Sequence, residues 1–171
     1  MGRRTVTALA AVCVLAAVLA VASCARTTVK TTSDKGGGGR PAGLGDTIAL
    51  KTVDTTWKVT PLKVKYFRTI KVGHKVIARR LTGVMLEIQN AGRKPISDTP
   101  SIGALLITVD GQELDAFSGL TGPHIMGEVW IAPGDERRGW ICFKASKGSA
   151  DKFRFTPDSG VADQSGEWLL K

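Results

Sequence analysis

The sequence is poor in the residues that most often build metal sites and nucleophilic centres. It has two histidines and three cysteines among 171 residues. His74 and His124 lie 50 residues apart, and neither belongs to an HxxH or HExxH pattern, so no zinc site is predicted. A GxSxG motif is absent, and the glycine run 36–39 is not followed by the Gly-Lys-Ser/Thr of a phosphate-binding loop. The sequence therefore predicts neither a catalytic centre nor a cofactor.

A long hydrophobic run is also missing. The longest is fifteen residues, Ala8 to Ala22, whereas a membrane-spanning helix needs about 20. The run follows Arg3 and Arg4 and ends in Val21-Ala22-Ser23-Cys24, an order that resembles the lipobox of bacterial lipoproteins. The alternative is an ordinary secretory signal with an incidental cysteine.

The lipobox resemblance implies that residues 1–23 form a signal peptide and that Cys24 carries a diacylglycerol, with a further acyl chain such as palmitate on its amino group. More than one chain matters, because a single chain anchors only marginally. We therefore expect a lipid-anchored protein on the extracytoplasmic face of the cell membrane, exported by the Sec or the twin-arginine route. Cys13 would leave with the signal peptide, so Cys142 lacks a disulfide partner and is interpreted as a buried thiol.

Residues 24–45 are rich in Thr, Gly and charge and show no hydrophobic periodicity. Such a segment buries too little apolar surface to offset its ordering entropy, which predicts a disordered tether.

Residues 46–171 are long enough for one domain with its own core. Short apolar runs separated by turn residues, such as Asp110-Gly111 and Pro133-Gly134, predict an all-β domain. We expect an antiparallel β-sandwich of about 7–9 strands. The expected strands are 47–53, 57–67, 82–90, the two halves of 102–117, 128–131, 137–145, 152–157 and 167–171, with a hairpin tip in 71–76 and an edge or bulge at Pro61.

The segments "GDTIAL", "GVMLEIQNAGRKPIS", "LLITVDGQELDAF", "IAPGDERRGWICFKA" and "KFRFTP" occur in this order. Together they resemble the exported bacterial immunoglobulin-like domains of unknown function that include the mycobacterial immunoprotective extracellular antigens. The resemblance covers most of 45–157 and implies an immunoglobulin-like sandwich at the cell surface. It implies no chemistry, because the family offers no catalytic residues to carry over.

Positive charge is concentrated in one part of the domain. No acidic residue occurs between Trp57 and Met85, while eight basic residues do: Lys58, Lys63, Lys65, Arg68, Lys71, Lys75, Arg79 and Arg80. A cationic hairpin held near a membrane would meet anionic lipid headgroups or wall polymer at high effective concentration. The alternative is a solvated face. Nucleic acid is not expected, because export and the absence of interleaved aromatics argue against it.

The sequence favours a lipid-anchored binding or interaction module, with an unknown protein as a further possible partner. An accessory envelope enzyme with a loop-borne site and a carrier of a small apolar ligand between the sheets are the alternatives. Three sets of residues are considered as possible sites. They are His124 with Ser118 or Ser146 for a Ser-His-Asp arrangement, Asp110, Glu113 and Asp115 of the acidic hairpin for calcium, and Trp57, Trp130, Trp140 and Trp168 for ligand binding. We interpret the acidic hairpin as solvated and the tryptophans as packing residues, an exposed tryptophan pair for ligand binding being the alternative.

Overall fold

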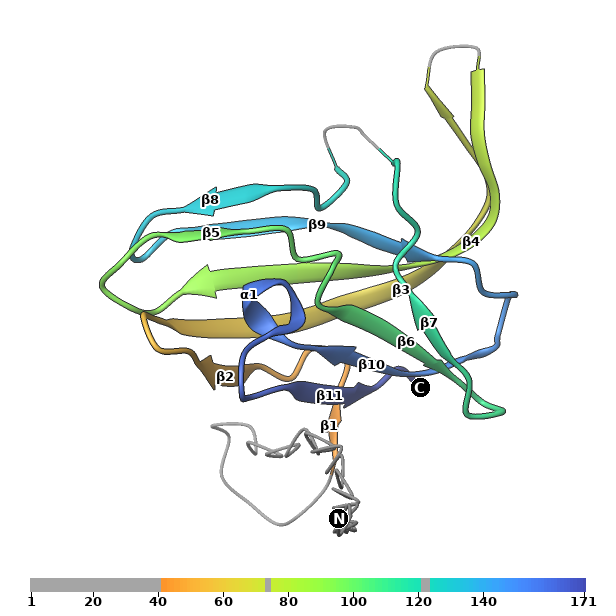
Figure 1. The fold of residues 1–171 in the computed structure, drawn as a ribbon. Coiled ribbons are helices and arrows are strands. Elements are labelled where there is room, and N and C mark those ends of the chain that lie inside the picture. The colour runs from red at the N-terminus through yellow and green to blue at the C-terminus, as the bar shows by residue number, and fades with distance from the viewer. Residues whose placement is uncertain (1–40, 73–74, 121–123) are drawn as a thin grey trace, which may run out of the picture.

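The computed structural model describes residues 41–72, 75–120 and 124–171, in which two β-sheets pack face to face (Figure 1). The five-stranded sheet has the order β1-β11-β10-β6-β7, the four-stranded sheet β2-β3-β4-β9, and β5 and β8 form a short pair. The strands are β1 (Ala42–Gly43), β2 (Ile48–Lys51), β3 (Thr56–Val72), β4 (Lys75–Asn90), β5 (Ile96–Asp98), β6 (Ala104–Thr108), β7 (Glu113–Asp115), β8 (Val129–Ile131), β9 (Glu136–Phe143), β10 (Ala150–Phe155) and β11 (Gly166–Leu169). One helical turn, α1 (Pro157–Gly160), follows β10.

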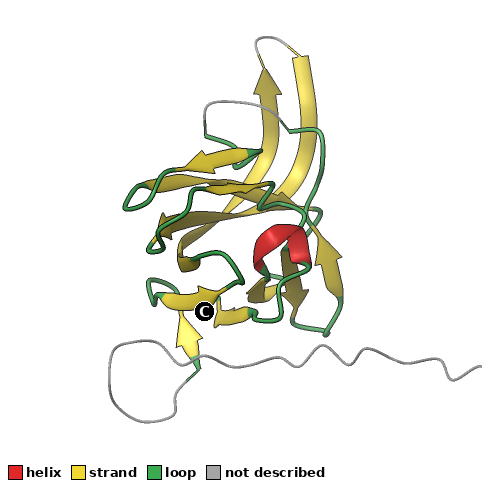
Figure 2. Cartoon of the chain, turned by 60° about the vertical axis from the view of Figure 1, so that its left-hand side comes forward, coloured by secondary structure: helices red, strands yellow, loops and turns green. Residues whose placement is uncertain are grey.

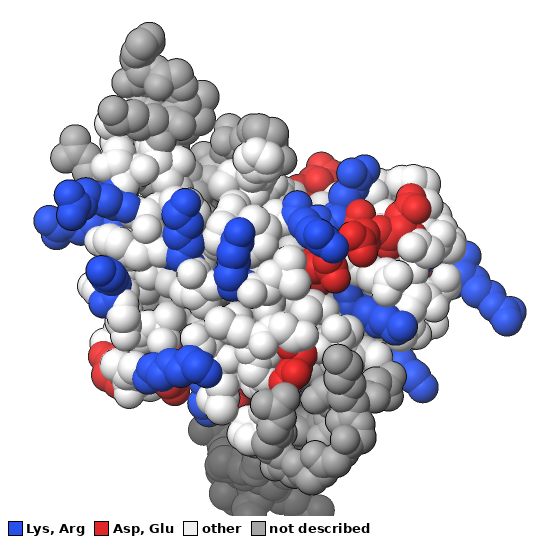
Figure 3. All heavy atoms as spheres, turned by 180° about the vertical axis from the view of Figure 1, so that it is seen from behind, with Lys and Arg blue, Asp and Glu red and all other residues white. Residues whose placement is uncertain are grey.

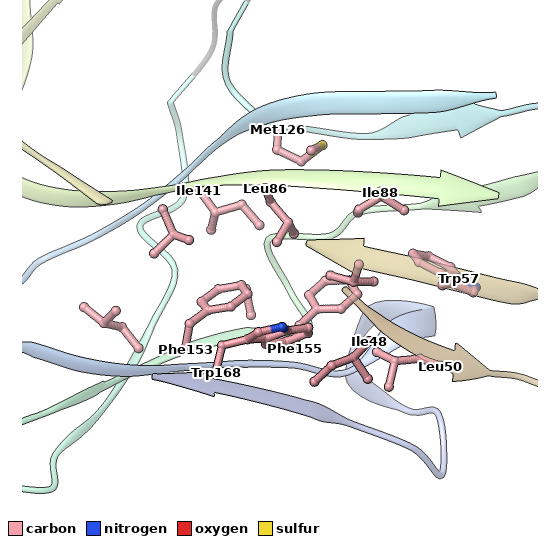
Figure 4. Packing of buried hydrophobic residues seen from close by; sticks show 14 of the residues in the cluster. Ile48, Leu50, Trp57, Leu86, Ile88, Met126, Ile141, Phe153, Phe155 and Trp168 are labelled. Carbon is pink, nitrogen blue, oxygen red and sulfur yellow. The ribbon is translucent and has the colours of Figure 1, made fainter. Parts of the chain in front are cut away.

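The core lies between the two sheets. Along β4, Val84, Leu86 and Ile88 are fully buried, while the alternating Met85 and Glu87 are only half-buried. This period of two is the expected mark of a strand with one face in the core. The opposite wall comes from β10 and β11, which contribute Phe153, Phe155 and Trp168 (Figure 4). Trp57 of β3 and Phe143 of β9 are also fully buried. The all-β sandwich predicted from the sequence is confirmed, with eleven strands in the described residues instead of about 7–9.

The turn predictions are also confirmed. Gly134 has φ 87°, and the backbone N–H of Asp135 donates to the carbonyl of Ala132, which closes the Pro133-Gly134 turn. Gly111 has φ 81° in the turn between β6 and β7. The separate expected segments 57–67, 71–76 and 82–90 prove to be one long hairpin, β3–β4, paired out to Val72 and Lys75. Its expected tip around Gly73 lies outside the described residues.

A β-bulge beside Pro61 sets which side chains of β3 face outward. The register with β4 shifts between Pro61 and Lys63, so that Leu62 is an extra residue. Before the shift Val59 points into the core and Lys58 outward; after it, Val64 packs against the core and Lys63 and Lys65 are exposed. Without the extra residue, the inward and outward sets beyond Pro61 would exchange faces.

The far part of the β3–β4 hairpin projects from the sandwich (Figures 1 and 2). β9 pairs with β4 only between Thr82 and Gln89, and β2 pairs with β3 only between Thr56 and Val59. In the described residues, the segment from Phe67 to Leu81 therefore has no sheet partner other than its own two strands. We call residues 67–81 the arm.

The chain enters the domain on the five-stranded sheet. Ala42 and Gly43 form β1, which pairs in parallel with Trp168 and Leu169 of β11 at the edge of that sheet. β1 lies within the segment 24–45 that the sequence predicts to be a tether, so ordered structure reaches at least four residues ahead of Asp46. Residues 1–40, including Cys24, lie outside the described residues.

Candidate functional site

Three lysines share the outer face of the four-stranded sheet. Lys58, Lys63 and Lys65 are exposed residues of β3, and they lie opposite Gln89, Met85 and Gly83 of β4, which alternate with the core residues of that strand. Register alternation on both sides of the bulge places them on one face. Together with Arg68 and Arg80 in the arm, both exposed, these lysines define what we call the basic face.

Aromatic rings support two of these lysines from below. The Nζ of Lys63 lies 5.5 Å from the ring centroid of Trp140, and the Nζ of Lys65 lies 5.2 Å from that of Phe67. The two rings meet edge to face, with centroids 5.1 Å apart. Cation–π contacts of this kind contribute about 0.5–1 kcal/mol at exposed sites, so they hold the ammonium groups in place while leaving them open to solvent.

Gly83 makes room for this aromatic pair. A Cβ atom at Gly83 would lie 2.7 Å from Phe67 and 3.1 Å from Trp140, so a larger residue would push the rings outward. Around the rings, a second buried cluster forms on this outer face from Ala78, Leu81, Trp140 and Cys142. The basic face is thus built on a packed apolar foundation, which the sequence pattern did not reveal.

The arm brings further basic residues together. Arg68 and Arg80 occupy opposing positions between the paired residues Phe67–Leu81 and Thr69–Arg79. Arg80 has φ 57°, a left-handed conformation that is uncommon outside glycine. Like charges placed directly opposite each other destabilise a β-ribbon. The other predicted basic residues, Lys71, Lys75 and Arg79, occupy paired backbone positions of the same arm, and their side chains lie outside the described part of the structure.

The basic face has no carboxylate partners in the part of the chain that the structure describes, whereas Lys94, Arg138, Lys152, Arg154 and Lys171 do. On the same sheet, Arg138 forms ion pairs with Glu87 and Glu136. Figure 3 shows a row of Lys and Arg side chains running from the foot of the arm across this view, with acidic side chains beside the row at the end far from the arm and others below it. Five basic side chains of the basic face are therefore left to interact with solvent or a partner.

One basic contact near this surface was not predicted from the sequence. Lys144, which follows β9, places its Nζ 5.1 Å from the ring centroid of Phe117. Phe117 packs against the second apolar cluster that also holds Trp140. The only sequence signal was the alternation of "WICFK", where Trp140, Cys142 and Lys144 share one face.

The residues considered for catalysis do not converge. His124 and Ser118 and Ser146 are exposed, and His124 contributes only its carbonyl, which accepts a hydrogen bond from Trp140 at 2.7 Å. Asp110 accepts a hydrogen bond from Thr108, and Glu113 pairs with Arg154, so the acidic hairpin forms no shared site. Among the described residues, no group of three His, Cys, Asp or Glu side chains is placed to hold a metal ion. His74 lies outside them.

Cys142 is a buried, unpaired thiol, as predicted. Desolvation by burial raises its pKa to about 11, so almost no thiolate exists at neutral pH. A thiol in this state is a poor nucleophile and metal ligand. Its role is to fill the second apolar cluster.

The four tryptophans have different roles. Trp57 and Trp168 are in the main core, and Trp140 supports Lys63 and is 9% exposed. Trp130 on β8 is 61% exposed and is the only one of the four that is largely open to solvent. The alternative of an exposed tryptophan pair is therefore wrong, and packing is the main role of these residues.

Among the described residues no helix has both the length and the apolar character needed to cross a bilayer.

Comparison with known proteins places the fold in context. No protein-family model matches the chain, and no curated protein matches it. Among solved structures, a secreted protein of Mycobacterium tuberculosis, MPT63, superimposes with a TM-score of 0.60 at 15% identity, over 77% of this chain and 99% of that one. The yjhA protein of Bacillus subtilis superimposes with a TM-score of 0.57 at 17% identity, over 76% and 99% of the two chains. The chain therefore shares the β-sandwich fold of these two bacterial proteins.

Proposed function

We propose that this chain is a lipid-anchored interaction module of the bacterial envelope, and that its basic face binds phosphate groups of an anionic surface. The observation that carries the proposal is the set of exposed lysines on β3, Lys58, Lys63 and Lys65, which have no acidic partner among the described residues. An extracytoplasmic location is supported by the lipobox-like sequence before Cys24 and by the secreted neighbour of the same fold.

A binding role fits this surface better than the two alternatives. The space between the sheets is occupied by large aromatic side chains such as Trp57, Phe153 and Trp168 (Figure 4), which argues against a carrier of an apolar ligand. An enzyme would need titratable groups that converge, and the described residues considered for that role lie apart. The basic face, in contrast, needs only accessibility and unpaired charge.

The proposal is tested with residues 25–171, which contain every described residue and the complete core. At low salt this form should bind at least one of two probes: long-chain polyphosphate, or vesicles of equimolar phosphatidylcholine and phosphatidylglycerol. Near 0.5 M salt the Debye length falls to about 4 Å, and the binding should disappear. Binding that does not respond to salt would contradict an electrostatic contact.

Two triple variants separate the basic face from net charge alone. Lys58→Gln, Lys63→Gln and Lys65→Gln together should weaken binding by up to about a hundredfold, because each charge contributes about 1 kcal/mol at most. The control changes Lys94, Lys152 and Lys171 to Gln, which removes the same charge from lysines that already have acidic partners. Equal losses in the two triples would refute the basic face as the site. Lys63 and Lys65, which lie beyond the part of β3 that pairs with β2, would then serve only to protect that edge from pairing with other chains.

A further inference from the structure

We infer that the partner of the basic face is a linear polyanion that lies on the side of the domain away from the tether, and not the membrane to which the chain is attached. This inference rests on the proposed function and specifies its partner. The expected chemistry is a hydrated polymer with regularly spaced phosphate groups. Three features of the structure support it: the alignment of the charges, the position of the apolar side chains, and the place where the chain enters the domain.

The basic residues of β3 are arranged in a line. Lys58, Lys63 and Lys65 lie on the outer face of one continuous strand of 17 residues. Residues two apart on one face of a strand are separated by about 7 Å, which is the separation of Lys63 and Lys65 along β3. A small anion can reach one or two such charges at a time, whereas an extended polymer lying along the strand can contact all of them in succession.

The basic face offers little apolar surface for insertion into a bilayer. Membrane-binding surfaces place aromatic and large aliphatic side chains at the acyl boundary. Here Phe67 and Trp140 lie beneath the lysines, and Trp130, the largely exposed tryptophan, lies on β8 of the separate two-stranded pair. Leu62 and Val76 are each 37% exposed but lie well apart along the hairpin. The contact is therefore polar.

The same arrangement argues against nucleic acid. Proteins that hold single strands stack successive bases on exposed aromatic rings. The rings of Phe67 and Trp140 meet each other edge to face and have ammonium groups above them. Their faces are therefore not available as a stacking platform, and only backbone phosphates would be recognised.

The entry point of the chain lies on the other sheet. β1 pairs at the edge of the five-stranded sheet, while the basic face belongs to the four-stranded sheet and the arm. Figures 1 and 2 show β1 and the arm at opposite ends of the molecule. The tether expected from the sequence would give residues 25–40 a root-mean-square reach of about 22 Å, whereas β3 alone extends about 55 Å. Contact between the arm and the anchoring membrane would require the chain to run back along the domain.

The test anchors residues 24–171 to vesicles through Cys24 and measures which lysines become protected. Coupling Cys24 to a maleimide lipid reproduces the anchor, and the buried Cys142 does not compete for the reagent. A water-soluble acetylating reagent then modifies exposed lysines, and mass spectrometry gives the rate at each one. Vesicles of phosphatidylcholine alone and of equimolar phosphatidylcholine and phosphatidylglycerol are compared, with and without long-chain polyphosphate. Lys94, Lys152 and Lys171 are internal controls.

We expect polyphosphate to slow acetylation of Lys58, Lys63 and Lys65 several-fold on both kinds of vesicle, with the control lysines unchanged. Phosphatidylglycerol alone should change none of these rates. Protection of the basic face by phosphatidylglycerol without polyphosphate would overturn the inference and leave the proposed function standing. Absence of protection in every condition would refute both. Protection by single-stranded DNA at a phosphate concentration ten times lower than polyphosphate requires would assign the face to nucleic acid instead.

Discussion

The two sheets of the sandwich both carry basic side chains on their outer faces, but the lysines of β3 on the four-stranded sheet have no carboxylate partner among the described residues. On the five-stranded sheet, Arg154 forms ion pairs with Glu113 and Glu167, and Lys152 shares Glu167. On the four-stranded sheet, Lys63 and Lys65 contact aromatic rings and no carboxylate among the described residues. The first arrangement contributes to folding stability, whereas the second leaves charge available for a partner.

The ion pairs of the five-stranded sheet also shift the pKa of Glu167. Burial alone would raise the pKa of Glu167, yet hydrogen bonds from Lys152 and Arg154 lower it below its ordinary value. The charged form of Glu167 is therefore favoured in the folded state. Stability from this group is fully present above its unfolded pKa, near 4.5, and is lost as the pH falls through the lower, folded value.

The largest predicted effect comes from a substitution in the apolar cluster beneath the basic face. Gly83→Val places a side chain where Phe67 and Trp140 now pack. Overpacking of this kind costs about 1–3 kcal/mol, which denaturant unfolding will measure. Because the rings that support Lys63 and Lys65 are displaced, binding to polyphosphate should weaken as well. Gly127→Val is the control for a general glycine effect, because a Cβ at Gly127 meets no atom within 4 Å and its φ is not in the left-handed region. A Gly83→Val variant with unchanged stability would contradict the packing described here.

The division between the two faces could be anticipated from sequence only in part. The strand pattern of β4 and the turns at Gly111 and Gly134 follow from local rules, because alternation and glycine positions are set by neighbouring residues. The acid-free run between Trp57 and Met85 also marked the basic face correctly as a region of unbalanced charge.

Other features depend on partners that are distant in the chain. Lys63 meets Trp140 only because β3 and β9 both pair with β4. Arg154 finds Glu113 and Glu167 through pairing of β6, β7, β10 and β11. Neither pairing has a local signature. β1 and β5 were missed because strands of two and three residues carry no periodicity to read.

A smaller effect on stability is expected from removing the ion pairs of the five-stranded sheet. Glu113→Gln and Glu167→Gln together remove the acidic partners of Arg154 and should reduce stability by about 1 kcal/mol at neutral pH, since partly exposed ion pairs contribute about 0.2–1 kcal/mol each. The wild type should lose this contribution as the pH falls below about 4.5, and the double variant should lack that part of the pH dependence. The appropriate assay is equilibrium unfolding across pH 3–7. The pH steps must be finer than about one unit, so that they resolve the titration of a single carboxylate. Parallel curves for the two proteins would refute the role of Glu167. The same variant creates unpaired basic residues on the five-stranded sheet, which lack the linear arrangement of β3.

The smallest effect concerns the arm, where charge and backbone geometry both oppose stability. Arg80 adopts φ 57° and faces the position of Arg68. Arg80→Gly relieves the left-handed conformation, which costs a non-glycine residue about 1 kcal/mol. Against this gain, glycine loses about 0.4–1 kcal/mol through the greater freedom of the unfolded chain.

The two backbone contributions at Arg80 nearly cancel, and the loss of like-charge repulsion adds a few tenths of a kcal/mol. We therefore expect Arg80→Gly to be as stable as the wild type or more stable by up to about 0.5 kcal/mol, and to bind polyphosphate more weakly at low salt. Arg80→Lys keeps the charge and should retain the binding, which separates the role of charge from that of the backbone. Chemical denaturation and the binding assay on the three proteins test both halves of the prediction. A loss of more than about 1 kcal/mol in Arg80→Gly would exceed the backbone cost and show that a stabilising contact holds Arg80. The arm would then resemble the five-stranded sheet in one respect, because its basic residues would contribute to folding stability.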